Sequence, residues 1–75
     1  MIPKDALINA IRSLNFTFKD QTDRVEIWKK RGSTDRVEIR RRDLHDPLAV
    51  RIILRQAGMA AGDIELFIQS ASRRH

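Results

Sequence analysis

Residues 23–42 read DRVEIWKKRGSTDRVEIRRR, and the letters DRVEI occur twice within them, at 23–27 and again at 35–39. Each copy alternates polar and apolar side chains, which is typical of a β-strand with one buried face. Arg31-Gly32-Ser33-Thr34 between the copies supplies turn residues. The stretch therefore predicts a basic, solvent-facing β-hairpin over about residues 24–42.

The alternation also predicts which side chains share a face of the hairpin. The buried face is expected to carry the apolar members of the two copies, Val25, Ile27, Val37 and Ile39. The solvent face is then expected to carry the residues between them, Arg24, Glu26, Trp28, Lys30, Arg36, Glu38, Arg40 and Arg42.

Two strand registers preserve these faces. Pairing Lys30 with Arg36 sets Glu26 opposite Arg40, whereas a register two residues shorter sets Glu26 opposite Glu38. Like charges directly opposite each other are unfavourable in an antiparallel pair. The sequence therefore favours the first register.

The segment before the hairpin predicts a helix and a third strand. Apolar residues recur at helical spacing over residues 3–14, and Asn15 suits the left-handed conformation that ends a helix. Residues 16–19 alternate apolar and polar side chains and predict a short strand, with a turn at 20–22.

The segment after the hairpin predicts a loop and two helices. Asp46 and Pro47 form a helix start, with the aspartate as N-cap and the proline at the first helical position, and Gly58 is the expected C-cap. Asp63 is expected to cap the last helix, and residues 71–75 are expected to form a frayed tail. The buried stripes of the two helices are expected to be Val50, Ile53, Leu54 and Ala57, and then Ile64, Phe67, Ile68 and Ala71.

The length of 75 residues predicts a single domain, residues 1–75, with a thin core. The order of elements predicts an α+β fold, α-β-β-β-α-α, with a three-stranded antiparallel sheet covered by helices on one face. The chain has no cysteine, which excludes disulfides and thiolate metal sites. It shows neither a bilayer-spanning apolar run nor a signal-peptide pattern, so no membrane is expected and the predicted location is cytoplasmic.

Charge is the feature that points to a ligand. Fifteen Lys and Arg residues stand against ten Asp and Glu, for a net charge of +5, and Arg suits bidentate contacts to phosphate. The pattern favours binding of nucleic acid or of an acidic protein over a merely solvated surface. Trp28 is expected to stack on an unpaired base or on a sugar, although it could instead cover part of the sheet or a helix edge. The residues expected to contact phosphates are Arg24, Lys30, Arg31, Arg36, Arg40 and Arg42.

Catalytic signals are few. His45 precedes Asp46, and such a pair could act in general base catalysis, but a solvent-exposed loop histidine is the simpler expectation. The sequence has no glycine-rich phosphate loop, no paired-carboxylate motif and no nucleophile signature. It therefore predicts no catalytic residue, no metal site and no cofactor.

One late stretch resembles a known family. Residues 50–58, Val-Arg-Ile-Ile-Leu-Arg-Gln-Ala-Gly, are similar to the late-helix signature of the HicA family of bacterial toxins, the messenger-RNA-cleaving members of toxin–antitoxin pairs. Leu14-Asn15-Phe16 is similar to the family's passage from first helix to first strand, and Arg36-Val37-Glu38-Ile39 to its third strand. The resemblance implies a fold like that of double-stranded-RNA-binding domains, and it implies RNA binding.

The chain departs from the family where cleavage occurs. HicA proteins carry a Gly-Ser-His element entering the second strand, and that histidine is catalytic. Here the matching stretch is Gln21-Thr22-Asp23-Arg24, which has neither the glycine nor the histidine. Arginine stays charged and cannot exchange a proton near neutral pH. The resemblance thus implies RNA binding without the family's histidine-dependent ribonuclease activity.

Two alternatives remain open at this stage. An active ribonuclease would need a replacement catalytic group, either His45 or the pair Asp23 and Arg24. A protein-interaction module would instead present the mixed Glu and Arg strands to an acidic, antitoxin-like partner or to a second copy of the chain.

Overall fold

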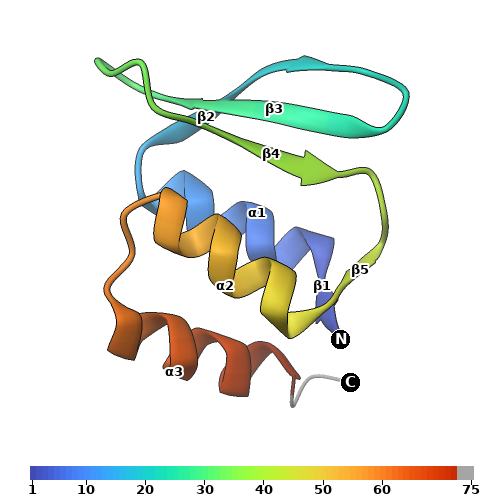
Figure 1. Cartoon of the computed structure of the whole chain (residues 1–75), viewed down its shortest axis with the longest axis vertical. Coiled ribbons are helices and arrows are strands. Elements are labelled where there is room, and N and C mark those ends of the chain that lie inside the picture. The colour runs from blue at the N-terminus through green and yellow to red at the C-terminus, as the bar shows by residue number, and fades with distance from the viewer. Residues whose placement is uncertain (73–75) are drawn as a thin grey trace.

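The computed structural model describes residues 1–72, which form three layers (Figure 1). A three-stranded antiparallel sheet in the order β2-β3-β4 lies on top, α1 and α2 pack under it, and α3 lies beneath them. This architecture confirms the predicted α+β fold and its order of main elements. The elements are β1 (Ile2–Pro3), α1 (Lys4–Ser13), β2 (Phe16–Gln21), β3 (Val25–Lys30), β4 (Arg36–Arg40), β5 (Leu44–His45), α2 (Pro47–Gln56) and α3 (Ala61–Ser72).

The ends of the first two long helices follow from single residues. Asn15, just after α1, has a φ of 71°, which confirms the predicted left-handed ending. Asp46 caps α2, because its Oδ1 accepts a hydrogen bond of 2.8 Å from the backbone N–H of Leu48. Gly58, past the end of α2, has a φ of +94°, a conformation that glycine adopts without strain.

The last helix differs from expectation at both ends. It begins at Ala61, so Asp63 is not its cap but lies in the first turn, where a carboxylate still interacts favourably with the helix dipole. The helix continues through Ala71, which is buried, to Ser72. A frayed tail from residue 71 is therefore wrong for these two residues, because Ala71 packs into the core; residues 73–75 lie outside the described part.

Two glycines give a matched test of this backbone geometry. A Cβ would meet no atom within 4 Å at either Gly58 or Gly62, but only Gly58 has a positive φ. Gly58→Ala should therefore destabilise the fold by about 1–2 kcal/mol. Gly62→Ala, inside α3, should instead stabilise it by about 0.5–1 kcal/mol. Chemical unfolding of both variants checks the opposite signs; equal effects would contradict the assigned geometry.

The hairpin is present, but its register is neither of the two expected. Trp28 pairs with Val37, and Lys29 with Arg36. The backbone N–H of Lys30 donates to the carbonyl of Asp35 at 2.9 Å, which leaves a four-residue turn at 31–34. This register lies one residue from each expected register, and a shift of one residue moves every side chain of a strand to the opposite face.

The two DRVEI copies consequently face opposite ways. Val37 and Ile39 are buried against the helices as predicted, whereas Val25 and Ile27 lie half-buried on the outer face. Trp28 takes their place in the core because its larger ring buries more apolar surface. The inner face therefore carries Glu26, Trp28, Val37 and Ile39, and the outer face carries Val25, Ile27, Lys29, Arg36, Glu38 and Arg40.

Two local predictions also need correction. β2 runs to Gln21, past a register shift between Phe18 and Asp20, so the turn falls at 22–24 rather than at 20–22. Residues 44 and 45, expected in a loop, form β5, which pairs with β1 and sets Ile2 opposite His45. Two-residue strands carry no periodic signal, which explains why the sequence did not predict them.

The core lies between the sheet and the helix layer and continues to α3. Its largest fully buried side chains include Phe16 from β2, Leu7 and Ile11 from α1, and Leu54 from α2. Ile64, Ile68 and Ala71 bury the inner side of α3, as predicted. Within residues 1–72, no helix is long and apolar enough to cross a membrane.

Candidate nucleic-acid interface

The outer face of the sheet presents a row of like charges. Lys29 and Arg36 are direct cross-strand partners, and Thr17 completes their row on β2. Like charges at directly opposite positions lower the stability of a sheet. The next rows pair Ile27 with Glu38 and Val25 with Arg40, so the only acidic side chain of β4 lies between its two arginines.

Within residues 1–72, the outer cations form no ion pair with a carboxylate. In the described part of the chain, the ion pairs are Lys4 with Glu26 and Arg51 with Glu65, and neither includes a residue of the outer face. The guanidinium groups of Arg36 and Arg40, both exposed, are thus available to an anionic ligand.

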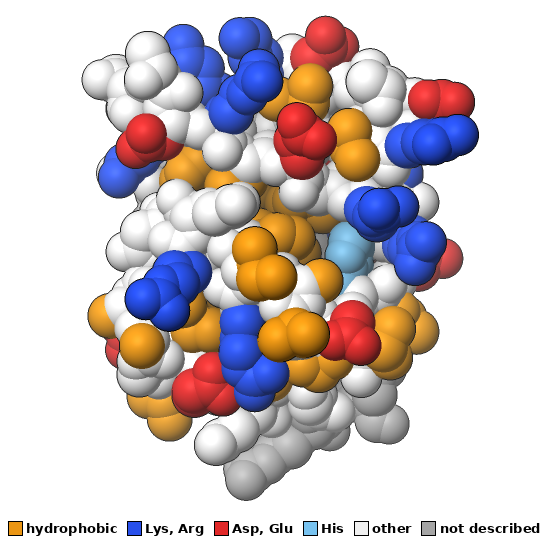
Figure 2. All heavy atoms as spheres, in the orientation of Figure 1, with side chains coloured by type: hydrophobic (Ala, Val, Ile, Leu, Met, Phe, Trp, Pro, Cys, Tyr) orange, Lys and Arg blue, Asp and Glu red, His pale blue; other side chains and the backbone are white. Residues whose placement is uncertain are grey.

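The predicted phosphate contacts divide into two groups at opposite ends of the hairpin. One group, at the β3–β4 turn, is Lys30, Arg31 and Arg36, with Lys29 beside them. The other is Arg24, Arg40 and Arg42, held together because the N–H of Arg41 donates to the carbonyl of Arg24 at 2.9 Å. Figure 2 shows Lys and Arg side chains gathered at both ends of the sheet. Arg36 and Arg40 are four positions apart in the sequence, or about 13 Å along an extended strand.

Trp28 does not lie where a base-stacking side chain was expected. Only 3% of it is exposed, and it faces the helices rather than the solvent. Its indole N–H donates to Oε1 of Glu26 at 3.1 Å, its ring meets Phe18 edge to face, and the Arg12 guanidinium lies over the ring. Stacking of Trp28 on a base at the outer face is therefore wrong.

Lys30 is also displaced from the outer face. It pairs with Phe16, whose side chain is buried on the helix side of the sheet, and it is half-buried itself. Its position at the end of β3 still places it near the turn, so it belongs to the basic group there. The one-residue difference in register accounts for both corrections.

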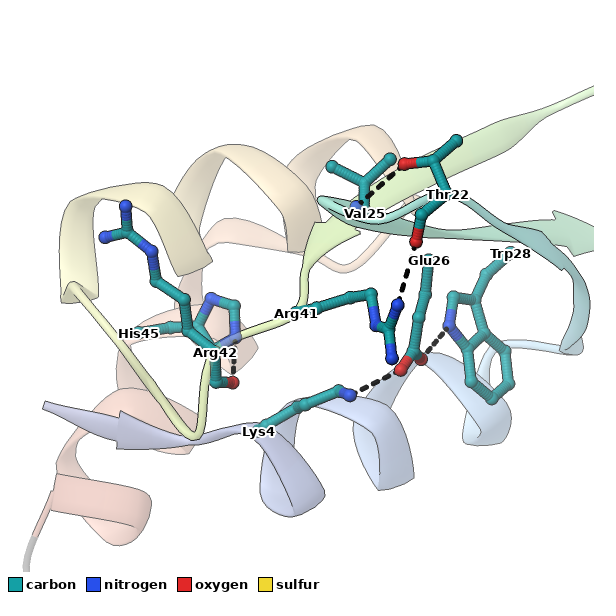
Figure 3. Close-up of polar contacts among 8 residues, drawn as sticks. All are labelled: Lys4, Thr22, Val25, Glu26, Trp28, Arg41, Arg42 and His45. Atoms are coloured by element: carbon teal, nitrogen blue, oxygen red, sulfur yellow. Dashed lines mark hydrogen bonds and ion pairs between the residues drawn. The ribbon is translucent and has the colours of Figure 1, made fainter.

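A cluster of polar contacts stabilises the carboxylate of Glu26 on the inner face of the sheet (Figure 3). The Lys4 ammonium forms an ion pair with its carboxylate, and the side chain of Glu26 is only 12% exposed. Burial raises the pKa of Glu26, but hydrogen bonds from Lys4 and Trp28 and the nearby charge of Arg41 together lower it below its usual value. Arg41 itself donates to the carbonyl of Thr22 at 3.0 Å. The cluster fastens the start of α1 to the sheet.

His45 is not a solvent-exposed loop residue. It lies in β5 with 5% of its surface exposed, and its Nε2 is 3.1 Å from the carbonyl oxygen of Arg42 (Figure 3). Burial lowers the pKa of His45, and the charges of Lys4 and Arg42 lower it further, against the opposing hydrogen bond to the Arg42 carbonyl. The ring is therefore neutral near pH 7 and donates that hydrogen bond.

This environment makes folding dependent on pH. Because the pKa of His45 is lower in the folded chain, its contribution to stability is complete above the ordinary histidine value of about 6.5 and declines as the pH falls below it. Unfolding midpoints measured from neutral to mildly acidic pH should show this decline. The His45→Gln variant can keep a donor to the Arg42 carbonyl but does not titrate, so its decline should be smaller. Parallel pH profiles for the two proteins would contradict the assignment.

The two alternatives for a replacement catalytic group lie in different parts of the fold. Asp23 and Arg24 lie exposed in the β2–β3 turn, whereas His45 is buried in the second, two-stranded sheet. Within residues 1–72, no three His, Asp or Glu side chains gather into a group able to hold a metal ion.

Two basic residues occupy positions that the sequence did not predict. Lys29 belongs to the basic cluster of the hairpin, but only the actual register brings it beside Arg36. Arg12 lies in the last turn of α1, and its contact with Trp28 depends on the tertiary packing of α1 against the sheet. No pattern in the sequence could have signalled that contact.

Comparison with known proteins finds no family model, no curated protein and no solved structure that matches this chain.

Proposed function

We propose that the chain is an RNA-binding domain of the HicA-like type that uses the outer face and ends of its hairpin, without histidine-dependent cleavage. The observation that carries the proposal is the direct pairing of Lys29 with Arg36, two cations that form no ion pair within residues 1–72. Such a pair costs stability in the free protein, and a bound phosphate would remove the repulsion.

The spacing of the two basic groups fits a polyanion rather than a single phosphate. The groups lie about 13 Å apart along the strands, and a nucleic acid strand offers a phosphate about every 3.4 Å along its axis. One backbone can therefore contact both groups, and it passes Glu38, which lies between them on the same face. RNA is favoured because the order of helix, three strands and helix accompanies the HicA-like stretch at residues 50–58.

The proposal that the chain lacks the family's cleavage chemistry is supported by the position of Asp23 and Arg24 in the fold as well as by the sequence. The segment that matches the family's histidine falls in the β2–β3 turn, where Asp23 and Arg24 are exposed. Arginine remains charged and cannot act as a general base. In this proposal Arg24 contacts phosphate and does not transfer a proton.

Salt dependence tests the proposal directly. Affinity for a short structured RNA should fall with salt, with a logarithmic slope of about 0.7–0.9 per phosphate contacted. Arg40→Ala combined with Arg42→Ala should lower that slope by about 2. A slope unchanged in this double variant, or equal affinity for a DNA duplex of the same sequence, would contradict the proposal.

A second candidate function is supported by an apolar surface on α2. Leu48 and Ile52 lie one helical turn apart and are 63% and 55% exposed. Figure 2 shows apolar side chains exposed over α2, and β4 is an edge strand of the sheet above. An acidic, antitoxin-like protein could add a strand to β4 and cover these two side chains.

The two candidates are separable by mutation. Leu48→Asp with Ile52→Asp should abolish capture of an acidic partner while leaving RNA affinity within about twofold, since both residues lie off the outer face. Capture at high salt in the absence of RNA would support the second candidate. Loss of RNA affinity in this variant, with the fold intact by circular dichroism, would show that α2 belongs to the RNA surface instead.

A further inference from the structure

A cleft opens where the end of α1 meets the start of β2 and the β3–β4 turn. Its volume is about 490 Å³, and its walls include Arg12, Asn15, Phe18, Trp28 and Arg31. Pockets that bind small molecules range over about 300–1,000 Å³. None of the residues that line this cleft is acidic.

One wall of the cleft is aromatic. Phe18 remains 49% exposed, although Phe16, two residues earlier on the same strand, is 1% exposed. The Phe18 ring meets the buried Trp28 ring edge to face, with centroids 5.7 Å apart and an interplanar angle of 82°. Trp28 thus supports Phe18 from within and leaves apolar ring surface of Phe18 open to a planar ligand.

The remaining walls supply positive charge. The Arg12 guanidinium lies 5.2 Å from the centre of the Trp28 ring, which fixes its orientation at the cleft. Arg31 enters from the β3–β4 turn, and its backbone N–H donates to the carbonyl of Asn15 at 2.9 Å. Neither arginine is in an ion pair within residues 1–72. Both can therefore donate to an anion.

We propose that this cleft binds one unpaired nucleotide of RNA, with the base stacked on Phe18 and the phosphate between Arg12 and Arg31. The inference rests on the proposed function and adds to it the part of the RNA that is recognised. Thr17 connects the two surfaces, because it lines the cleft and lies in the same cross-strand row as Lys29 and Arg36. A strand bound along the outer face can thus turn into the cleft, where stacking contributes about five- to hundredfold in affinity per base.

Trp28 gives the cleft its own spectroscopic signal. It is the only tryptophan, and the chain has no tyrosine. Excited at the red edge of indole absorption, where adenine is transparent, its fluorescence should change saturably as adenosine monophosphate is added to the full chain. The expected dissociation constant is about 1 mM, the scale of a single exposed contact site. Adenosine and inorganic phosphate, each lacking one of the two groups recognised, should bind at least about tenfold more weakly.

Three variants locate the signal. Phe18→Ala and Arg31→Ala should each weaken binding of adenosine monophosphate by about tenfold. Arg55→Ala, on α2 and outside the cleft, should leave it unchanged. No saturable change in the wild type, or an equal change in all three variants with the fold intact by circular dichroism, would overturn the inference.

RNA probes identify the source of the nucleotide. An RNA hairpin with a single-nucleotide overhang should bind about tenfold more tightly than its blunt counterpart, and Phe18→Ala should remove that preference. Binding of both RNAs with no preference would overturn this inference while the proposed function stands. If adenosine monophosphate binds saturably but neither RNA binds, the nucleotide does not come from RNA, and the proposed function is overturned as well.

Discussion

Trp28→Ala should leave the chain largely unfolded. The indole is 3% exposed and contacts Phe18, Arg12 and Glu26. Replacing a buried tryptophan with alanine costs about 3–5 kcal/mol, and a core of this size rarely supplies more than about 3–5 kcal/mol in total. Circular dichroism and hydrogen exchange at neutral pH should therefore show loss of most of the helix and sheet signal. Trp28→Phe, which keeps the ring volume in part, should fold with reduced stability.

Ile27→Ala is the matched control for that result. Ile27 is the neighbour of Trp28 on β3, but it lies half-buried on the outer face opposite Glu38. Truncation of the Ile27 side chain should lower the free energy of unfolding by about 1 kcal/mol. In the registers that place Trp28 toward solvent, Ile27 lies in the core, so Ile27→Ala should destabilise the fold more than Trp28→Ala. A larger loss for Ile27→Ala than for Trp28→Ala would therefore contradict the register described above.

The contrast between these two residues shows what the sequence could predict about the fold. Helix ends were predictable where one residue determines the local backbone, as Asn15, Asp46 and Gly58 do. The strand register was not, because alternation in each strand fixes its two faces but not which of them turns inward. Two identical pentapeptides suggested identical orientations, whereas packing of the Trp28 ring and the ion pair of Glu26 with Lys4 favoured opposite ones.

The same limit applies to the candidate site. Arg36 and Arg40 were predicted on the outer face and lie there, because β4 has the expected orientation. With the actual orientation of β3, Lys29 faces outward whereas Lys30 and Trp28 face inward, so one cation replaced another on the outer face and one aromatic residue was lost. The cleft beside Arg12 could not be predicted, since it is formed by three segments that are distant in the sequence.

Lys29→Glu should stabilise the protein and weaken RNA binding at once. The substitution converts the repulsion between Lys29 and Arg36 into an attraction, which should raise stability by about 0.2–1 kcal/mol. At the RNA surface it replaces an attraction of about 1 kcal/mol at 4 Å in water with a repulsion of similar size. Affinity for structured RNA should therefore fall by about thirtyfold, and the salt slope by about 1 or more. Thermal unfolding and RNA titration at several salt concentrations measure the two effects on the same sample.

Arg55→Glu is the control that separates the loss of a local RNA contact in Lys29→Glu from the effect of the change in net charge. Arg55 is exposed in the last turn of α2, away from the outer face, and the substitution changes the net charge by the same amount. Because a cation there interacts favourably with the helix dipole, this variant should lose about 0.3–1 kcal/mol of stability. Screening over about 8–10 Å at moderate salt should keep its RNA affinity within about threefold of wild type. Equal affinity losses in the two variants would mean that total charge alone attracts RNA. A gain in stability together with a loss of affinity, confined to Lys29→Glu, would identify the outer row as a surface that binds phosphate at the expense of folding free energy.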